Sequence, residues 1–219
     1  MHWTRRFRDV ALAPTARDKQ RRVGPSNLSN PCARCLAHDL LGVEENDNPF
    51  VMGSWIGTAI HERLEKLILD SSTGWIAERK LYIGELGSYG PIKGTSDLYI
   101  PEEATVVDFK TTTRDKLKGL LDEDSFKSFS YVAQLHLYGL GVENLGDPVR
   151  NLTIVYIPRD SVTWDDIRFR TVAYDREYAE HVLQRGLDIW EWLEDGGDPD
   201  TLEKTPGCFT CDYTHNSWA

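Results

Sequence analysis

The stretch KGTSDLYIPEEATVVDFK, residues 93–110, decides the fold of this chain. It holds two β-rich runs separated by Pro101-Glu102-Glu103, a combination that favours a tight turn. If the runs form one antiparallel hairpin centred on that turn, Asp97 and Asp108 lie directly opposite each other. Lys110 follows Asp108 by two positions, so strand alternation returns it to the same face.

Two carboxylates and a lysine on one face predict a metal site. Like charges at opposed positions repel each other, and the apolar neighbours Val106, Val107 and Phe109 indicate a buried strand, where unpaired charges are costly. A divalent cation removes this objection, and hard oxygen ligands suit Mg²⁺ or Mn²⁺. Such an ion lowers the pKa of a bound water and polarises a phosphate, while Lys110 could hold that water or stabilise developing charge. The alternative is an exposed hairpin with three surface charges, which the apolar neighbours disfavour.

The order of the predicted elements is typical of a mixed α/β sheet flanked by helices. The length of 219 residues favours one domain, which we expect at residues 26–219 after a basic N-terminal arm at residues 1–25. Helical spacing and β-rich runs predict helices at Ser26–Gly42 (interrupted or preceded by a break at Pro31), Ser54–Leu69, Ser125–Leu140 and Asp175–Glu194, and strands at Trp75–Ile83, Pro91–Ile100, Ala104–Lys110, Asn151–Ile157 and Ile167–Ala173.

The four cysteines form two CxxC pairs at opposite ends of the chain, Cys32 with Cys35 and Cys208 with Cys211. Residues 1–8 lack the apolar segment of a secretory signal, so we expect a reducing cytoplasm, where structural disulfides are rare. The pairs therefore predict a metal site that joins the N- and C-terminal segments. Their spacing suits a zinc ion and a [4Fe–4S] cluster equally.

Four short motifs in this sequence resemble those of one nuclease group. Asp97, ten intervening residues and Asp108-Phe109-Lys110 resemble the PD-(D/E)xK motif of that superfamily. Gly57-Thr58-Ala59-Ile60-His61 resembles the first motif of its RecB-like branch, and Gln134-Leu135-His136-Leu137-Tyr138 resembles the later QxxxY motif. Glu78 stands where several relatives carry an acidic active-site residue.

This resemblance implies a restriction-endonuclease-like core and a role for each matched residue. It implies Mg²⁺ or Mn²⁺ bound by His61, Asp97, Asp108 and the backbone carbonyl of Phe109; a catalytic group of Asp97, Asp108, Lys110 and Glu78; and substrate binding by Gln134 and Tyr138. Gln134 and Tyr138 are four positions apart, so on a helix they share a face.

The cysteine segment is similar to that of the Cas4-like nucleases, a RecB-like subfamily. The match runs from Ser26 to Cys32. Members of that subfamily carry an iron–sulfur cluster held by one early and three late cysteines, whereas this chain has two of each. The resemblance therefore implies a [4Fe–4S] cluster at Cys32, Cys35, Cys208 and Cys211, with Zn²⁺ as the alternative.

As a function, the motifs predict a Cas4-like exonuclease that hydrolyses linear DNA from its ends, in recombination, repair or phage DNA metabolism. Such an enzyme would work in the cytoplasm of a bacterial or phage-infected cell, with possible protein partners in recombination or replication. The alternatives are a structure-selective endonuclease, an end-trimming subunit of a larger complex, or a non-catalytic nucleic-acid-binding module.

Charge and hydropathy limit the other classes of partner. The net charge of −10, taken alone, speaks against a general nucleic-acid binder with a broad basic face, but it is a sum over opposed regions: residues 1–22 carry +5 and residues 160–203 carry −9. We therefore expect DNA binding to depend on a divalent metal and a free end. No apolar run approaches the roughly 18 residues of a membrane span, so we expect no membrane partner.

Overall fold

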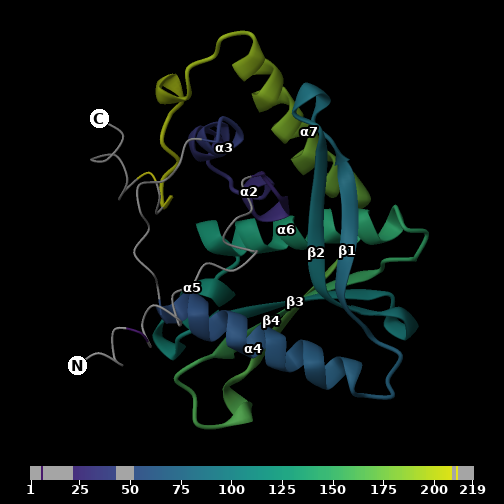
Figure 1. Cartoon of the computed structure of the whole chain (residues 1–219). Helices are drawn as coiled ribbons and strands as arrows, with labels where there is room; N and C mark the ends of the chain where they lie inside the picture. The colour runs from purple at the N-terminus through teal and green to yellow at the C-terminus, as the bar shows by residue number, and fades with distance from the viewer. Residues whose placement is uncertain (1–5, 7–21, 43–51, 209–210, 212–219) are drawn as a thin grey trace.

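A five-stranded sheet forms the centre of the computed structural model, which describes residue 6, residues 22–42, residues 52–208 and residue 211. The strands lie in the order β1-β2-β3-β4-β5, and only β3 and β4 run parallel to each other. Helices cover both faces, which confirms the predicted mixed α/β class (Figure 1). The strands are β1 (Ile76–Glu85), β2 (Pro91–Ile100), β3 (Thr105–Thr112), β4 (Asn151–Pro158) and β5 (Arg168–Ala173).

The β2–β3 hairpin has the predicted register. Leu98 pairs with Val107 and Ile100 with Thr105, around a single 3₁₀ turn at Pro101–Glu103. The pairing between β2 and β3 ends at Leu98 and Val107. Beyond this point β2 pairs with β1, and β3 pairs with β4. The sheet therefore divides into a tall β1–β2 hairpin and a lower β3–β4–β5 layer, and we call the point of separation the fork (Figure 1).

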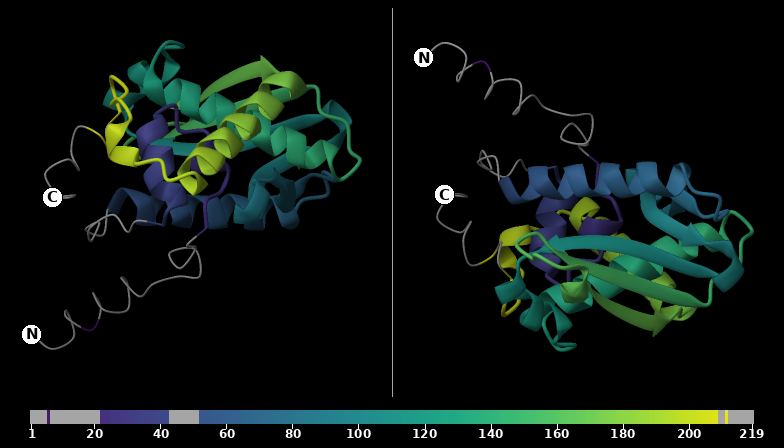
Figure 2. Two further views of the ribbon diagram at one scale, coloured as in Figure 1. Left: turned by 90° about the horizontal axis from the view of Figure 1, so that it is seen from above. Right: turned by 90° about the horizontal axis from the view of Figure 1, so that it is seen from below.

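Two long helices enclose the fork from opposite sides of the sheet. Helix α4 (Met52–Leu69) packs on β1 and β3, and α6 (Phe126–Glu143) packs on all of β1 to β4 (Figure 2). Alternation along β3 sends Val106 into the main core and Val107 into a smaller apolar cluster with residues of α4. Residues 108 and 110 thus share the face of Val106, toward α6.

The remaining helices form a layer outside α6. Helix α7 (Arg176–Glu194) packs on α6 and on α3 (Ala33–Leu40), while the short α2 (Pro25–Leu28) lies against α6. The predicted helix at residues 26–42 is thus two helices separated at residues 29–32. Helix α5 (Arg114–Leu121) was not predicted.

The predicted N-terminal arm lies mostly outside the described residues. Residues 1–5 and 7–21 are not described, whereas Val23 is buried in the main core and Pro25 begins α2. The packed part of the chain therefore starts slightly before residue 26. Within the described ranges, no helix combines the length and apolarity needed to cross a bilayer.

Candidate active site and metal centre

Asp97 and Asp108 lie at the base of the fork, where β2 and β3 part. Both side chains are buried, at 7% and 3% exposure. Asp97 Oδ2 accepts a hydrogen bond of 2.7 Å from the Phe109 backbone N–H, which replaces the strand pairing lost at this point. Because the N–H and C=O of one extended residue point to the same side, the Phe109 carbonyl also faces the fork. The structure thus brings together the oxygen atoms that the motifs predict as metal ligands.

Helix α4 delivers His61 to the same place from the other side of the sheet. His61 Nδ1 lies 3.5 Å from Asp97 Oδ1, and its ring meets the Phe109 ring edge-on at 6.0 Å between centroids. One turn earlier, Gly57 is the buried residue of α4 and faces Thr111 of β3. The absence of a side chain at Gly57 lets α4 approach β3 closely enough for His61 to reach the carboxylates.

Lys110 connects the carboxylates to α6. Its Nζ lies 2.7 Å from Asp108 Oδ2 and donates a hydrogen bond of 2.9 Å to Gln134 Oε1. Gln134 Nε2 in turn donates to Tyr138 Oη at 2.7 Å. Gln134 and Tyr138, predicted to bind substrate, are therefore joined to the predicted catalytic lysine by a continuous chain of hydrogen bonds.

Tyr131 also belongs to this site, and the sequence reasoning missed it. Lys110 Nζ lies 4.8 Å from the centroid of the Tyr131 ring, within the range of a cation–π contact. Tyr131 precedes Gln134 by three positions on α6, so helical spacing carried the signal. The ring and the Asp108 carboxylate hold the ammonium in place.

Glu78 is positioned by the strand register and has an unusual backbone. Ala77 pairs with Leu98 and Arg79 with Ser96, so Glu78 on β1 stands across from Asp97 on β2. Its φ of +47° lies in the left-handed region, which costs a non-glycine residue on the order of 1 kcal/mol. The place agrees with the motif; an active-site role for Glu78 stays a prediction.

The charges in the fork shift one another's pKa values. Burial raises the pKa of Asp108 to about 6, with the charge of Asp97 adding to the rise and those of Lys110 and His61 opposing it. Burial lowers the pKa of His61, but the close Asp97 carboxylate and the charge of Asp108 outweigh this and raise it overall. Burial likewise lowers the pKa of Lys110, but the neighbouring Asp108 carboxylate raises it by more. The pKa is therefore raised overall, and Lys110 stays charged.

These groups fit a divalent metal ion. Asp108 Oδ2 and His61 Nδ1 are both buried, and neither has a hydrogen bond of good geometry within the described part of the chain. Their neighbours at 2.7 and 3.5 Å are ion-pair contacts only. Two carboxylates, a backbone carbonyl and an imidazole form a mainly oxygen donor set, which suits Mg²⁺ or Mn²⁺.

The binding of Mn²⁺ is expected to weaken as the pH falls. The ion needs Asp108 and His61 deprotonated, and both groups have raised pKa values, so protons compete with the metal. Below a pH of about 6, where Asp108 as well as His61 takes up a proton, metal binding displaces two protons, so apparent affinity should drop by up to about a hundredfold per pH unit. Calorimetric titrations between pH 8 and pH 5 measure this, and an affinity that stays constant over that range contradicts it.

Gly57→Ala is expected to slow any metal-dependent reaction at the fork about tenfold, because small displacements of catalytic groups are costly. A Cβ at this position would lie 2.8 Å from Thr111 Oγ1, which is too close, so we expect α4 to shift away from β3 and to displace His61. Adding Thr111→Ala removes that hydroxyl and should restore the rate. Gly119→Ala in α5, where nothing lies within 4 Å, is the matched control and should leave it unchanged. Failure of the double variant to recover would contradict this explanation.

A cavity of about 450 Å³ opens beside the hydrogen-bond chain of α6. Its charged groups are Lys80 and Lys93, from β1 and β2 respectively. Lys80 Nζ donates to Thr95 Oγ1 at 3.1 Å, which holds it at the cavity wall. The lining residues are Gly24, Pro25, Ser26, Lys80, Lys93, Gly94, Thr95, Gln134 and Tyr138.

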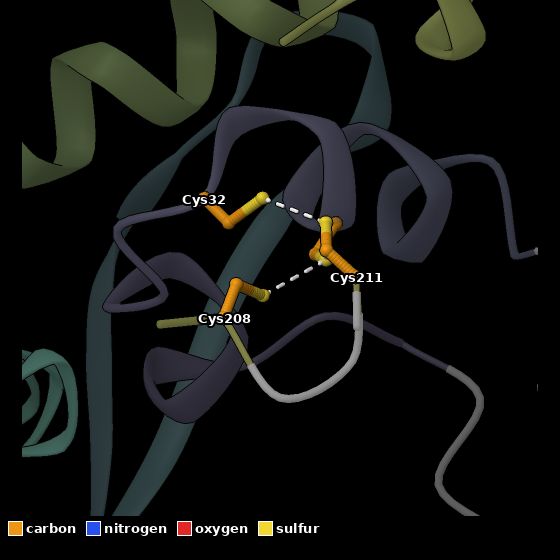
Figure 3. A group of neighbouring side chains, drawn as sticks. Cys32, Cys208 and Cys211 are labelled. Atoms are coloured by element: carbon orange, nitrogen blue, oxygen red, sulfur yellow. Dashed lines mark hydrogen bonds between the residues drawn. The ribbon is translucent and has the colours of Figure 1, made fainter. Parts of the chain in front are cut away.

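The four cysteines gather in a second centre away from the fork. All four are buried, and their sulfur atoms lie within 4.8 Å of one another (Figure 3). Cys32 caps the N-terminus of α3 and Cys35 lies in its first turn, while Cys208 and Cys211 come from the C-terminal segment that returns past this helix. The predicted joining of the two ends is confirmed.

Comparison with known proteins identifies similar folds. The sequence matches no family model and no curated protein. Among solved structures, a putative exonuclease from Eubacterium rectale aligns over 92% of this chain and 93% of its own, with 13% identity and a TM-score of 0.54. A phage-related exonuclease from Haemophilus somnus 129PT aligns over 80% and 96%, with 13% identity and a TM-score of 0.53. The alkaline exonuclease LHK-Exo from Laribacter hongkongensis, in complex with dAMP, aligns over 80% and 89%, with 14% identity and a TM-score of 0.51. At these identities the likeness concerns the fold.

Proposed function

We propose that this chain is a divalent-metal-dependent deoxyribonuclease of the PD-(D/E)xK type that degrades linear DNA from its ends. The observation that carries the proposal is the fork, which brings Asp97, Asp108, Lys110 and His61 together from three elements, although repulsion and burial oppose this arrangement. Folds similar to those of exonucleases, one of them solved with dAMP, support it.

The residues divide the work of phosphodiester hydrolysis among them. His61, Asp97, Asp108 and the Phe109 carbonyl would hold Mg²⁺ or Mn²⁺, which when bound supplies an activated water and charge neutralisation at the phosphate. Lys110 places its ammonium next to Asp108, where it orients the attacking water and stabilises negative charge on the phosphate. Gln134 and Tyr131 keep that ammonium from turning away.

The cavity beside Gln134 and Tyr138 provides a path for the substrate strand. Lys80 and Lys93 offer positive charge to phosphates in a chain whose net charge is −10. Tyr138 and Gln134 line this path and supply hydrogen-bonding and stacking groups to it. A path confined to one cavity suits a single strand fed from an end better than a broad duplex-binding face does.

The experiment compares DNA forms that differ only in whether they have ends. With Mn²⁺ or Mg²⁺, the protein should degrade linear single- and double-stranded DNA to short products and leave covalently closed circles intact. Labels at the 5′ or 3′ terminus report the direction of digestion. Cutting of circular single-stranded DNA would indicate a structure-selective endonuclease instead, and binding without cleavage in either metal would indicate a non-catalytic module. A Cas4-like role in recombination, repair or phage DNA metabolism rests on the activity being exonucleolytic.

A further inference from the structure

The spacing of the cysteine sulfurs carries information about what they bind. Cys32 Sγ lies 3.4 Å from Cys211 Sγ, and Cys35 Sγ lies 3.5 Å from Cys208 Sγ and 3.4 Å from Cys211 Sγ. No pair among the four exceeds 4.8 Å. All four thiols are free, so none of these contacts is a disulfide.

This spacing matches a single tetrahedral ion. With metal–sulfur bonds of about 2.3 Å, the edges of a tetrahedral four-thiolate site are about 3.8 Å long. A [4Fe–4S] cluster instead carries its thiolates outside an iron–sulfide cube, which places neighbouring cysteine sulfurs roughly 6 Å apart. Every pair of sulfur atoms here lies within 4.8 Å, which is too short for any pair in such a cluster. The iron–sulfur cluster that the motif resemblance implies therefore does not fit this site.

We propose that Cys32, Cys35, Cys208 and Cys211 bind one structural zinc ion. Two CxxC pairs that form a buried tetrahedron are a usual arrangement for structural zinc. The d¹⁰ zinc ion imposes no geometry of its own and accepts four thiolates arranged in this way. Between the divalent ions of zinc and iron, the order of intrinsic affinities also favours zinc. The assignment is independent of the nuclease activity proposed for the fork.

The surroundings of the cysteines suit a closed, negatively charged metal–thiolate centre. A zinc ion with four thiolates carries a net charge of −2, and Arg185 of α7 lies close enough to Cys32 for their charges to interact. The guanidinium is fixed there by hydrogen bonds to the carbonyls of Pro31 (3.0 Å) and Leu28 (3.4 Å). Phe126, at the start of α6, packs against the cluster and helps to exclude water.

The test measures what the full chain contains when both metals are offered. Cells are supplied with iron and zinc, and the protein is purified without oxygen so that a labile cluster would survive. We expect about one zinc per chain, no acid-labile sulfide and a colourless solution. Asp108→Asn should keep the zinc, because the fork is a separate site, whereas Cys208→Ser should lose it. Cobalt exchanged into the site should give the intense visible bands of a tetrahedral thiolate complex, together with a thiolate-to-metal charge-transfer band.

Three results would each overturn the assignment. Iron with an equal amount of acid-labile sulfide would identify an iron–sulfur cluster. One iron without sulfide would identify a single iron ion in the same tetrahedron. Protein without metal but with four titratable thiols would show that the cysteines bind nothing. The wild-type measurement alone decides among these, even if Cys208→Ser fails to fold.

Discussion

Asp108→Asn is expected to lower the rate of DNA cleavage by roughly a thousandfold. The carboxylate is the group that connects the proposed metal to Lys110, whose Nζ lies 2.7 Å from it. An amide of the same shape binds a divalent cation poorly and leaves the ammonium without its counter-charge. Both the position of the metal and the position of Lys110 are therefore lost in one substitution.

The same substitution should not harm the metal-free fold. Burial raises the pKa of Asp108 to about 6, above its unfolded value, so between these two pKa values the native state holds a proton that the unfolded state has lost. Stability in the metal-free protein therefore falls as the pH rises through that window, and a neutral side chain avoids this loss. Loss of the counter-charge of the buried Lys110 ammonium works against this gain, so the stability of the metal-free Asp108→Asn variant at pH 7 should stay within about 1 kcal/mol of the parent.

Thermal melts of chelator-treated protein and a cleavage assay in Mn²⁺ measure the two effects separately. Asp188→Asn, an exposed carboxylate of α7, is the matched control and should change neither. A variant that melts well below the parent would mean that Asp108 is a structural residue. A variant that cleaves at the parental rate would remove the basis of the proposed active site.

The hairpin register was predictable because local and long-range requirements agree. A slip by one residue would turn Val106 and Val107 to the wrong faces, and Pro101 permits the turn at only one place. The opposition of Asp97 and Asp108 follows from that register. By contrast, α5 has only eight residues, with Gly119 among them, so its three leucines at helical spacing cover too short a stretch to predict a helix.

The features that sequence reasoning missed depend on distant segments. The hydrogen bond from the Phe109 N–H to Asp97 exists because β2 leaves β3 for β1, a tertiary event that no local pattern encodes. The cavity combines residues of the N-terminal segment, both strands of the β1–β2 hairpin and α6. Tyr131 had the right spacing from Gln134, but an aromatic residue at helical spacing is more often part of a core.

Loss of the cysteine centre is expected to be the most destabilising single change in the chain. Cys208→Ser removes one of the four ligands, and with it the bound metal. The long stretch of chain between α3 and the C-terminal cysteines is then no longer closed into a loop. Closing a loop of this length is worth about 5 kcal/mol in the chain-entropy description used for disulfides, so a loss of roughly 3 to 5 kcal/mol is expected. Urea unfolding of metal-replete protein measures it.

A surface contact at the same junction provides the control. Arg34 of α3 forms an ion pair with Asp200 and donates to its backbone carbonyl, but the Asp200 side chain is 56% exposed. Asp200→Asn should therefore cost at most about 1 kcal/mol. If it costs as much as Cys208→Ser, the two ends are held by ordinary packing rather than by a metal.

The cysteine centre should also affect DNA binding, because it supports one wall of the cavity. Pro25 and Ser26 of α2 line the cavity together with Gln134, and only a short segment separates them from Cys32. Phe126 anchors the beginning of α6 on the cysteines. In Cys208→Ser, a rise in KM larger than the fall in kcat is expected, since the fork itself is built from β2, β3 and α4. If KM rises no more than kcat falls, at a temperature where the variant remains folded, the centre does not affect DNA binding and its role is only to stabilise the fold.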